Sequence, residues 1–257
     1  MVLDFVNEAR AAGKKMLAVL VDPDKATREN LALLAGFAND GLVDLFLWGG
    51  SLVNSEQAGF YLEYLKRQLE SSTPVVLFPG SVYQLDERAD ALLFLSLISG
   101  RNPELLIGKH VEVAARIKQR GLETIPTGYM LIDGGRPTSV SYVSNTTPLP
   151  ADKPPLAAAT ALAGELLGLR LIYMDAGSGA QHPISPAMIR AVRREVSLPV
   201  VVGGGIRSAA RARQSLLAGA DIVVVGNGLE QDSSWLPELA AAVRSVSAEL
   251  TAHRSVG

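Results

Sequence analysis

Three glycine-rich segments are the part of this sequence best suited to bind an anion. They are residues 175–179, 203–205 and 226–228, and each lies at the end of a short apolar run. Glycine allows positive φ values and a close approach of the main chain to a ligand, so consecutive N–H groups can surround an anion. One such segment would serve equally well as a simple turn. Three at equivalent positions favour a phosphate site.

Acidic and hydroxyl side chains follow two other apolar runs and could bind a metal. Asp22 and Asp24 follow the first run, and Ser51 follows Gly49 and Gly50 after the second. Magnesium is often held by one or two carboxylates together with substrate phosphates. The same residues could instead cap helices, because aspartate and serine accept hydrogen bonds from the first N–H groups of a helix. The sequence leaves both interpretations open.

Asp175 stands at the end of the sixth apolar run, in the first glycine-rich segment. A carboxylate at that point could accept a proton from a substrate hydroxyl group. Alternatively, it could accept hydrogen bonds from N–H groups of the loop that follows. Tyr129, Tyr142 and Tyr173 are predicted to be core or rim residues, and the position of Tyr173 makes it the most interesting of the three.

The composition excludes several classes of site. The chain has 257 residues and no cysteine, which excludes disulfides, thiolate nucleophiles and cysteine-ligated metals. Its 3 histidines are scattered, so a bound metal should be a hard cation such as Mg²⁺. The formal net charge is −2 without a basic cluster, and we expect no nucleic-acid partner. No apolar window reaches the ~18 residues of a membrane helix and no signal peptide is recognisable, so we expect a soluble, cytoplasmic protein.

Eight short apolar runs alternate with amphipathic segments along the chain. The runs are almost continuous in apolar residues, which is typical of parallel strands that are covered on both faces. The predicted strands are Met16–Val21, Val43–Trp48, Val75–Phe78, Ala91–Ile98, Thr124–Ile132, Leu171–Met174, Val200–Val202 and Ile222–Val225. The clearest predicted helices are Thr27–Asn39, Pro103–Arg120, Pro186–Val196 and Ser208–Ala218.

This alternation predicts βαβ units, and eight of them favour an α/β fold of the (β/α)8 TIM-barrel type, with residues 1–257 as a single domain. A doubly wound sheet is the alternative. The link after Phe78 is short, so one outer helix is expected to be missing or irregular. Segment 134–155 is long and rich in proline, serine and threonine. We expect it to be a functional lid or a disordered loop on the ligand-binding face of the barrel.

Several motifs together resemble the geranylgeranylglyceryl phosphate synthase family. They are residues 21–25, 49–51, 95–103, 128–135, 172–180, 202–207, 219–221 and 225–227. The motifs span nearly the whole chain in the order that the family shows, and their combination is more specific than any one of them. The likeness is strongest to the branch found in some archaea and in certain bacteria.

The resemblance implies a prenyltransferase that joins sn-glycerol 1-phosphate to a long prenyl diphosphate, with geranylgeranyl diphosphate as the expected donor. It implies that Asp22 and Ser51 bind Mg²⁺ and that Asp175 is the catalytic base. The residues implied to hold the glycerol phosphate are Tyr173, Met174, Asp175, Ala176, Gly177, Ser178, Gly179, Gly204, Gly205, Gly226 and Asn227. An apolar trench lined by the helices would bind the prenyl chain, and a homo-oligomer is expected by likeness.

Asp175 departs from the family pattern, in which glutamate is expected at this position. Aspartate is one methylene shorter, which withdraws the carboxylate by roughly 1 Å, and a displacement of that size can cost ~100-fold in rate. A bridging water or a weaker role for the residue would accommodate the difference. Two other functions therefore stay open. One is a phosphate-binding barrel isomerase or lyase, and the other is a non-catalytic barrel that binds a phosphorylated metabolite.

Overall fold

The computed structural model describes residues 1–70, 72–226, 229 and 233–254, and it shows a closed barrel of eight parallel strands. Each strand pairs with its neighbours in sequence order, and β8 pairs with β1 to close the barrel. The strands are β1 (Met16–Val21), β2 (Leu45–Trp48), β3 (Val75–Leu77), β4 (Ala91–Leu97), β5 (Glu123–Leu131), β6 (Leu171–Asp175), β7 (Val200–Gly203) and β8 (Ile222–Val225). The predicted (β/α)8 fold is confirmed, and a doubly wound sheet is excluded.

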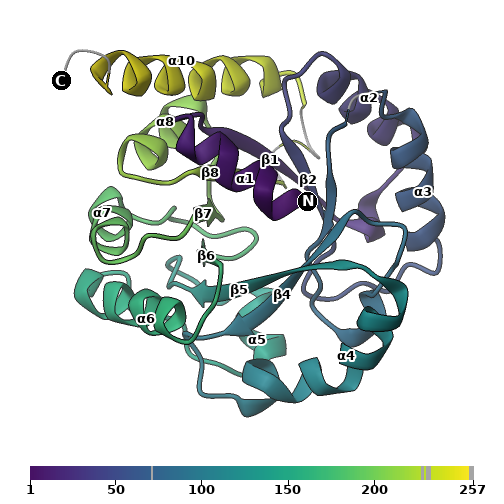
Figure 1. Ribbon diagram of the computed structural model, residues 1–257, viewed down its shortest axis with the longest axis horizontal. Helices are drawn as coiled ribbons and strands as arrows, with labels where there is room; N and C mark the ends of the chain where they lie inside the picture. The colour runs from purple at the N-terminus through teal and green to yellow at the C-terminus, as the bar shows by residue number, and fades with distance from the viewer. Residues whose placement is uncertain (71, 227–228, 230–232, 255–257) are drawn as a thin grey trace.

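Helices surround the barrel (Figure 1). They are α1 (Val2–Ala11), α2 (Arg28–Asn39), α3 (Ala58–Gln68), α4 (Lys109–Arg120), α5 (Ser139–Ser144), α6 (Pro154–Leu166), α7 (Pro186–Glu195), α8 (Ala209–Leu217) and α10 (Leu236–Arg254). The side chains of Thr27, Ser185 and Ser208 accept hydrogen bonds from the first turns of α2, α7 and α8, which determines where these helices begin. Among the described residues, no helix is both long and apolar enough to cross a membrane.

The connection between β3 and β4 lacks an α-helix, as the short link after Phe78 predicted. Only a 3-10 turn, Val82–Gln84, lies there. The predicted helix Pro103–Arg120 is divided in the structure, because a π-helical turn, Glu104–Gly108, precedes α4. One helix of the barrel is therefore missing and the next one begins irregularly.

Segment 134–155, which follows β5, is an ordered part of the fold. It contains α5, and Ile132 forms an isolated parallel bridge with Leu149 beside the barrel. The side chains of Ser139 and Val140 face a cavity at the end of the strands. These observations agree with the lid interpretation and not with a disordered loop.

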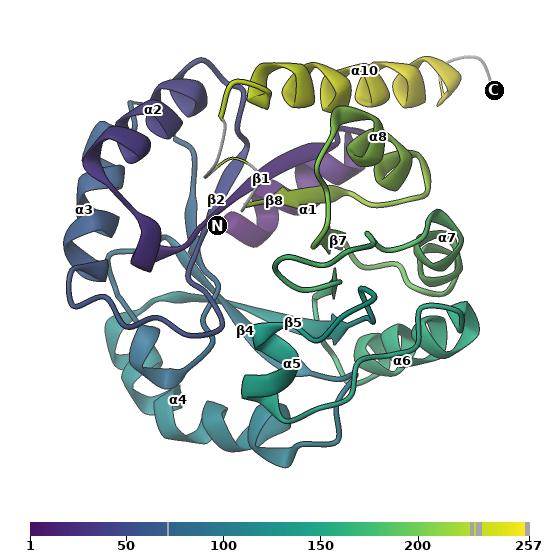
Figure 2. The same cartoon turned by 180° about the vertical axis from the view of Figure 1, so that it is seen from behind.

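Apolar side chains form two layers, one inside the barrel and one between the strands and the helices. The inner layer includes Leu45, Ile125 and Val224 from the strands together with Val2 and Val6 from α1. Helix α1 therefore closes the amino-terminal end of the barrel, where it lies in front of the strands in Figure 1. Figure 2 shows the opposite end, with α5 toward the viewer. Because all strands are parallel, the loops that follow them gather at that carboxyl-terminal end.

A buried carboxylate ties together four elements at the amino-terminal end of the barrel. The side chain of Asp221, before β8, is only 6% exposed and lies 3.0 Å from Arg193 Nη1 of α7. Lys15 Nζ lies 3.2 Å away, and Arg10 Nε of α1 lies 3.5 Å away. The main-chain N–H of Val200 also donates to Asp221. Removing the carboxylate would leave these cations and one N–H group without their buried partner.

Replacing Asp221 with alanine should therefore destabilise the protein by about 3–5 kcal/mol, the usual cost of breaking a buried ion pair. For a chain of this size, the melting temperature should fall by on the order of 10 °C. Calorimetry at pH 7 measures the change. The matched control is Asp4→Ala, which removes a 55% exposed carboxylate from α1 and should cost less than about 1 kcal/mol. Equal losses in the two variants would contradict the structural role of Asp221.

Candidate functional site

A cavity of about 370 Å³ lies at the carboxyl-terminal ends of the strands, and we call it the basin. All eight strands, or the loops that follow them, contribute to its walls. Nine of the predicted site residues line it: Asp22, Ser51, Tyr173, Asp175, Ser178, Gly179, Gly204, Gly205 and Gly226. Residues that are separate in the sequence are thus brought to one chamber.

The carboxylate of Asp175 lies at the wall of the basin, and the residue is only 8% exposed. Its Oδ2 accepts a hydrogen bond from the Tyr129 hydroxyl group at 2.6 Å, and its Oδ1 accepts one from the Gly177 N–H at 2.8 Å. Burial raises the pKa of Asp175, and the two hydrogen bonds offset part of this effect. A carboxyl group with a raised pKa beside a cavity is suited to accept a proton from a substrate.

Two buried tyrosines adjoin this carboxylate. Burial, and after it the negative charge of Asp175, raises the pKa of both Tyr129 and Tyr173 well above its usual value. Both rings therefore stay neutral, and Tyr129 acts as a hydrogen-bond donor. Phe78 stacks on Tyr173 with 5.0 Å between the ring centroids and meets Tyr129 edge-on at 5.8 Å. This packing holds the hydroxyl group of Tyr129 against Asp175.

Gly204 allows the loops after β6 and β7 to approach each other. Its φ is +79°, and a Cβ at this position would lie 2.8 Å from Asp175 Oδ1 and from the main-chain nitrogens of Ala176 and Gly177. Any larger residue would displace the carboxylate. Within the part of the chain that the structure describes, the N–H groups of Gly204 and Gly205 have no hydrogen-bond acceptor. They are therefore available to an anion in the basin.

Asp22 and Ser51 line the side of the basin formed by the loops after β1 and β2. Asp22 Oδ1 accepts a hydrogen bond from the Asp24 N–H at 3.1 Å, so Asp22 caps the short 3-10 turn Pro23–Lys25. Its Oδ2 lies 3.5 Å from Lys25 Nζ. The capping and metal-binding interpretations of Asp22 are thus compatible, because the residue that caps this turn also faces the basin.

Asp24 serves a different purpose from Asp22. Its carboxylate accepts hydrogen bonds from the main-chain nitrogens of Asn54 and Ser55 at 2.7–2.9 Å. It does not line the basin; instead it holds the loop that carries Ser51. The cap of α2 comes from Thr27 and not from Asp24, because the Thr27 hydroxyl group accepts a hydrogen bond from the Asn30 N–H.

The donor set around Asp22 fits one kind of metal binding. Across the described residues, no cluster of three or more acidic or histidine side chains could hold a metal ion. One carboxylate and one hydroxyl group do not form a complete cage. They do fit a Mg²⁺ ion that keeps water molecules and is completed by substrate phosphates. Asp22 and Ser51 are therefore compatible with a metal that arrives with a phosphorylated substrate.

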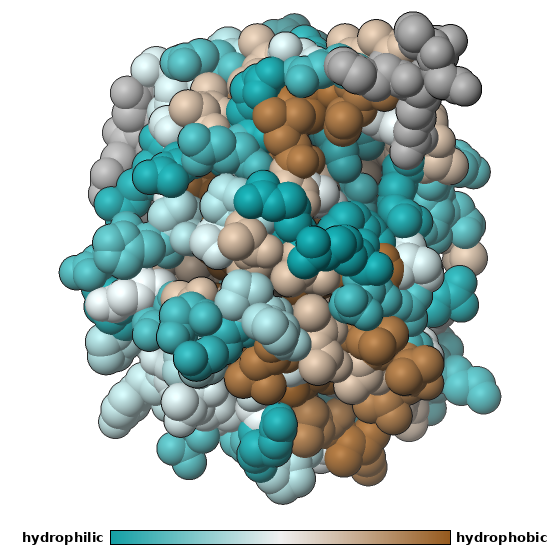
Figure 3. Space-filling model, turned by 90° about the vertical axis from the view of Figure 1, so that its left-hand side faces the viewer, coloured by the Kyte–Doolittle hydropathy of each residue, from teal (hydrophilic) through white to brown (hydrophobic). Residues whose placement is uncertain are grey.

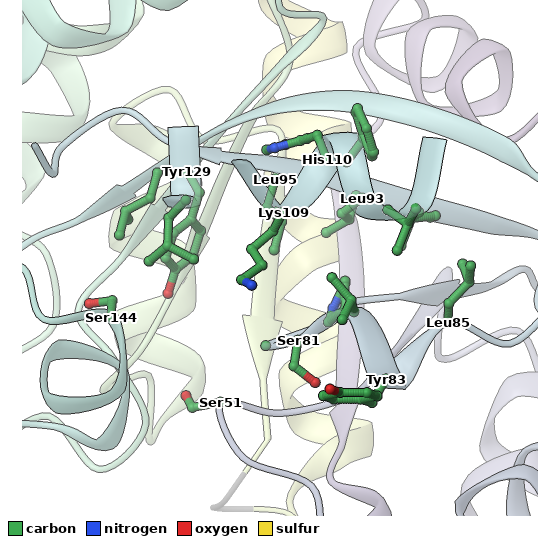
Figure 4. A pocket seen from close by; sticks show the side chains of 18 of the residues that line it. Ser51, Ser81, Tyr83, Leu85, Leu93, Leu95, Lys109, His110, Tyr129 and Ser144 are labelled. Atoms are coloured by element: carbon green, nitrogen blue, oxygen red, sulfur yellow. The ribbon is translucent and has the colours of Figure 1, made fainter. Parts of the chain in front are cut away.

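A second cavity, also of about 370 Å³, adjoins the basin, and we call it the groove. It lies where the helix between β3 and β4 is missing. Figure 4 shows Leu93 and Leu95 of β4 on one side of it and Tyr83 and Leu85 on another, with Lys109 pointing inward. The residues that line both cavities are Ser51, Pro79, Gly80, Leu95, Tyr129 and Val140. Most lining residues of the groove are apolar, and His110 there is buried edge-on against Phe94.

Three of the predicted residues that the structure describes, Met174, Ala176 and Gly177, are not lining residues of the basin. Met174 and Ala176 are buried in the layer between the strands and the helices. Gly177 takes part through its N–H, which donates to Asp175. Asn227 lies outside the described residues. The assignment of Met174 and Ala176 to the site can therefore refer only to their main chain.

Tyr129 is the functional candidate that the sequence alone underestimated. It was predicted to be a core or rim residue, yet it contacts Asp175 and lines both cavities. The pairing of neighbouring strands could have indicated this role, because Tyr129 is the register partner of Tyr173 across β5 and β6. Phe78 and Arg207 also line the basin, although neither was predicted to be a site residue.

Comparison with known proteins identifies the family. The sequence matches the PcrB family over residues 10–245. The chain belongs to the PcrB family. A geranylgeranylglyceryl phosphate synthase from Spirosoma linguale is 52% identical over 242 residues, which cover 94% of this chain and 96% of that protein. One from Korarchaeum cryptofilum is 40% identical over 231 residues, covering 89% and 93%. The resemblance drawn from the motifs is confirmed.

Solved structures agree with this membership in the PcrB family. The (S)-3-O-geranylgeranylglyceryl phosphate synthase of Thermoplasma acidophilum, in complex with substrate sn-glycerol-1-phosphate, is 30% identical to this chain, with a TM-score of 0.88. The match covers 96% of this chain and 99% of that one. A thiamine phosphate pyrophosphorylase from Pyrococcus furiosus is 17% identical with a TM-score of 0.57, over 93% of this chain and 98% of that one. That second likeness shows the fold alone.

In this PcrB-family protein, Tyr129→Phe removes the hydroxyl group that donates to Asp175 but keeps the ring. Because that hydrogen bond lowers the pKa of Asp175, its loss should raise the pKa further above its usual value. The acidic limb of the pH profile of kcat/KM should then move to higher pH, since a base must be unprotonated to act. On that limb, activity should fall by roughly 2- to 10-fold, which corresponds to the loss of a hydrogen bond worth about 0.5–1.5 kcal/mol.

The matched control is Tyr61→Phe, which removes a hydroxyl group from α3, outside both cavities. Its pH profile should match that of the unaltered protein. If the limb stays in place when Tyr129 is replaced, Asp175 is not the group whose ionisation controls turnover.

Proposed function

We propose that this PcrB-family protein is a prenyltransferase that forms an ether bond between sn-glycerol 1-phosphate and a long prenyl diphosphate, releasing diphosphate. The observation that carries the proposal is the junction of the two cavities at Ser51, Leu95 and Tyr129. A phosphorylated acceptor in the basin and a hydrocarbon donor in the groove would meet beside Asp175. The names of the relatives, and the substrate bound to the Thermoplasma acidophilum enzyme, support the same pair of substrates.

The phosphate of the acceptor is assigned to the β7 side of the basin. The N–H groups of Gly204 and Gly205 are available there, and Arg207 lines the same wall. An array of main-chain N–H groups binds a dianion without a large entropy loss, because the groups are already held in place. Tyr173, Ser178, Gly179 and Gly226 complete the predicted binding surface.

The diphosphate is assigned to the side of the basin where Asp22, Lys25 and Ser51 lie. Asp22 and Ser51 would hold Mg²⁺ there together with the diphosphate oxygens. When bound, the metal would supply neutralisation of the charge that develops on the leaving diphosphate. Lys25, which lies 3.5 Å from Asp22, adds a positive charge to the same side of the chamber.

Asp175 is the proposed base. It would accept the proton of the acceptor's 3-hydroxyl group as that oxygen bonds to the first carbon of the prenyl chain. The bond between this carbon and the diphosphate oxygen would break, and the electron pair would leave with the diphosphate. Tyr129 would keep the carboxylate in its unprotonated, oriented form by donating to Oδ2. Where the shorter aspartate does not reach, a water molecule can relay the proton.

The prenyl chain is assigned to the groove. Its binding is driven by removal of hydrocarbon from water, at roughly 0.8 kcal/mol for each buried CH₂ group. Leu93, Leu95, Leu105 and Val113 provide apolar contact surface. The location of the protein in the cytoplasm stays a prediction, and so does its homo-oligomeric state.

An assay that resolves the two glycerol phosphate enantiomers tests the proposal. The protein should convert geranylgeranyl diphosphate and sn-glycerol 1-phosphate into an ether product and diphosphate only when Mg²⁺ is present. With sn-glycerol 3-phosphate the rate should fall on the order of 100-fold, because the hydroxyl group and the phosphate no longer reach their sites together. Chelation of the metal should abolish turnover, and adding Mg²⁺ back should restore it.

The absence of product with either enantiomer and every prenyl length would end the proposal. The Asp22→Asn variant separates the metal from general loss of activity, since it should need roughly 10-fold more Mg²⁺ for half-maximal turnover. Asp40→Asn is the matched control, because Asp40 is exposed at the end of α2 and lines neither cavity. Equal Mg²⁺ requirements in both variants would remove Asp22 from the metal site.

A bulky residue at the far end of the groove tests the assignment of the prenyl chain. Figure 4 shows Leu85 on the opposite side of the groove from Tyr129. Leu85→Trp should lower kcat/KM for a 20-carbon donor on the order of 10-fold or more, since several CH₂ groups lose their place, and it should spare a 10-carbon donor. Leu217→Trp on α8, outside both cavities, is the control. An equal effect on both donors would contradict the assignment.

A further inference from the structure

Segment 134–155, the lid segment, begins with residues that pack against the loop after β6. The main-chain oxygen of Gly134 accepts hydrogen bonds from the N–H groups of Gln181 and His182, at 2.9 and 3.0 Å. A Cβ at Gly134 would lie 2.6 Å from the Cβ of Ala180, so only glycine permits this approach. The start of the lid segment and the loop after β6 are therefore fastened together at the wall of the basin.

This packing places the guanidinium group of Arg136 against Gly179. A Cβ at Gly179 would lie only 2.6 Å from Arg136 Nη2, so the guanidinium group occupies the space that a side chain there would fill. Gly179 lines the basin together with Ser178, on the side assigned to the phosphate of the acceptor. Arg136 does not line the basin itself. One residue of the loop after β6 therefore lies between its charge and the cavity.

The charge of Arg136 is not neutralised within the part of the chain that the structure describes. There the exposed side chain of Arg136 forms no ion pair and no hydrogen bond. Other exposed arginines do have carboxylate partners: Arg67 pairs with Glu63, and Arg120 pairs with Glu87 at 2.9 Å. A guanidinium group presents a charge and several N–H donors, so an unpaired one next to a cavity is suited to attract an anion.

A second arginine contacts the same loop from the other side. Arg207 follows β7, donates through Nη2 to the main-chain oxygen of Ala180 at 3.1 Å, and lines the basin. Arg136 follows β5, and β6 pairs with both β5 and β7, so the loop after β6 lies between the two arginines. Two positive charges match the two negative charges that a phosphomonoester carries above its second pKa of about 6.

We propose that Arg136 is a positioning residue for a dianionic phosphomonoester, whose phosphate it attracts from behind Gly179 while Arg207 and the N–H groups of the basin hold it directly. The two charges would be separated by one residue, a distance comparable to the Debye length of about 8 Å at physiological ionic strength. Salt therefore screens this attraction only in part. The inference rests on the proposed function for the identity of the acceptor, whereas phosphate binding itself can be measured without turnover.

Steady-state kinetics with each substrate varied in turn tests the assignment. Arg136→Gln should raise KM for sn-glycerol 1-phosphate on the order of 10-fold, because one attractive charge is lost. Its kcat should change little, since the phosphate carries the same charge in the bound acceptor and in the transition state. KM for the prenyl diphosphate should stay the same, because that substrate is assigned to the side of the basin near Asp22. Arg136→Lys, which keeps the charge, should recover most of the loss.

Arg194→Gln is the matched control. Arg194 is an exposed arginine of α7 that forms no ion pair among the described residues and lines neither cavity. Helix α7 lies on the side of the molecule shown in Figure 3, where hydrophilic side chains cover the middle of the surface. The control removes the same charge there, so it should leave every kinetic constant unchanged. An equal rise in KM for both variants, or a loss confined to kcat in Arg136→Gln, would overturn the role of Arg136.

Calorimetric titration with inorganic phosphate tests the site without catalysis. The unaltered protein and Arg194→Gln should bind phosphate equally, and Arg136→Gln should bind it on the order of 10-fold more weakly. Higher ionic strength should narrow that gap, because added salt screens the attraction. Unchanged affinity in Arg136→Gln, no recovery in Arg136→Lys, or no measurable phosphate binding by the unaltered protein would overturn the proposal. A protein that binds phosphate in the expected pattern but forms no ether product would contradict only the proposed function.

Discussion

The burial of the Asp175 carboxylate determines how the residues around it are arranged at the carboxyl-terminal end of this barrel. A carboxylate removed from water is costly unless hydrogen bonds replace its hydration. Tyr129 and the Gly177 N–H provide those bonds, and Gly204 leaves room for the carboxylate because it has no side chain. Phe78 then holds the tyrosines in place. The compensation is incomplete, since burial still raises the pKa of Asp175, and this leaves the group reactive.

The buried carboxylates at the two ends of the barrel have different surroundings. At the amino-terminal end, three cations and a main-chain N–H surround Asp221. That carboxylate lines neither the basin nor the groove, and it connects α1, α7 and the strands. At the carboxyl-terminal end, neutral hydroxyl and amide groups surround Asp175 beside an open chamber. The separation follows a general property of such barrels, in which one end serves stability and the other serves chemistry.

Departures from regular barrel geometry account for the features specific to this protein. The missing helix between β3 and β4 leaves an apolar groove beside the basin, so a long hydrocarbon and a small phosphorylated molecule can occupy adjoining cavities. On another side, α6 keeps its place in the ring of helices but has an uncharged outer face. Each departure exposes apolar surface that a solitary regular barrel would cover or replace with charge.

The sequence by itself determined the fold and most of the site. The eight predicted apolar runs end within a few residues of the observed strands. The glycine-rich segments, Asp22 and Ser51 line one chamber because parallel strands bring their carboxyl ends together. Only the tertiary structure decided that Asp24 holds a loop, that Met174 packs outward, and that Tyr129 contacts Asp175. These roles depend on which side of a strand each residue faces and on contacts across neighbouring strands. A local sequence pattern indicates the periodicity of one helix or strand, but contacts between elements that are distant in the chain form only when the barrel closes.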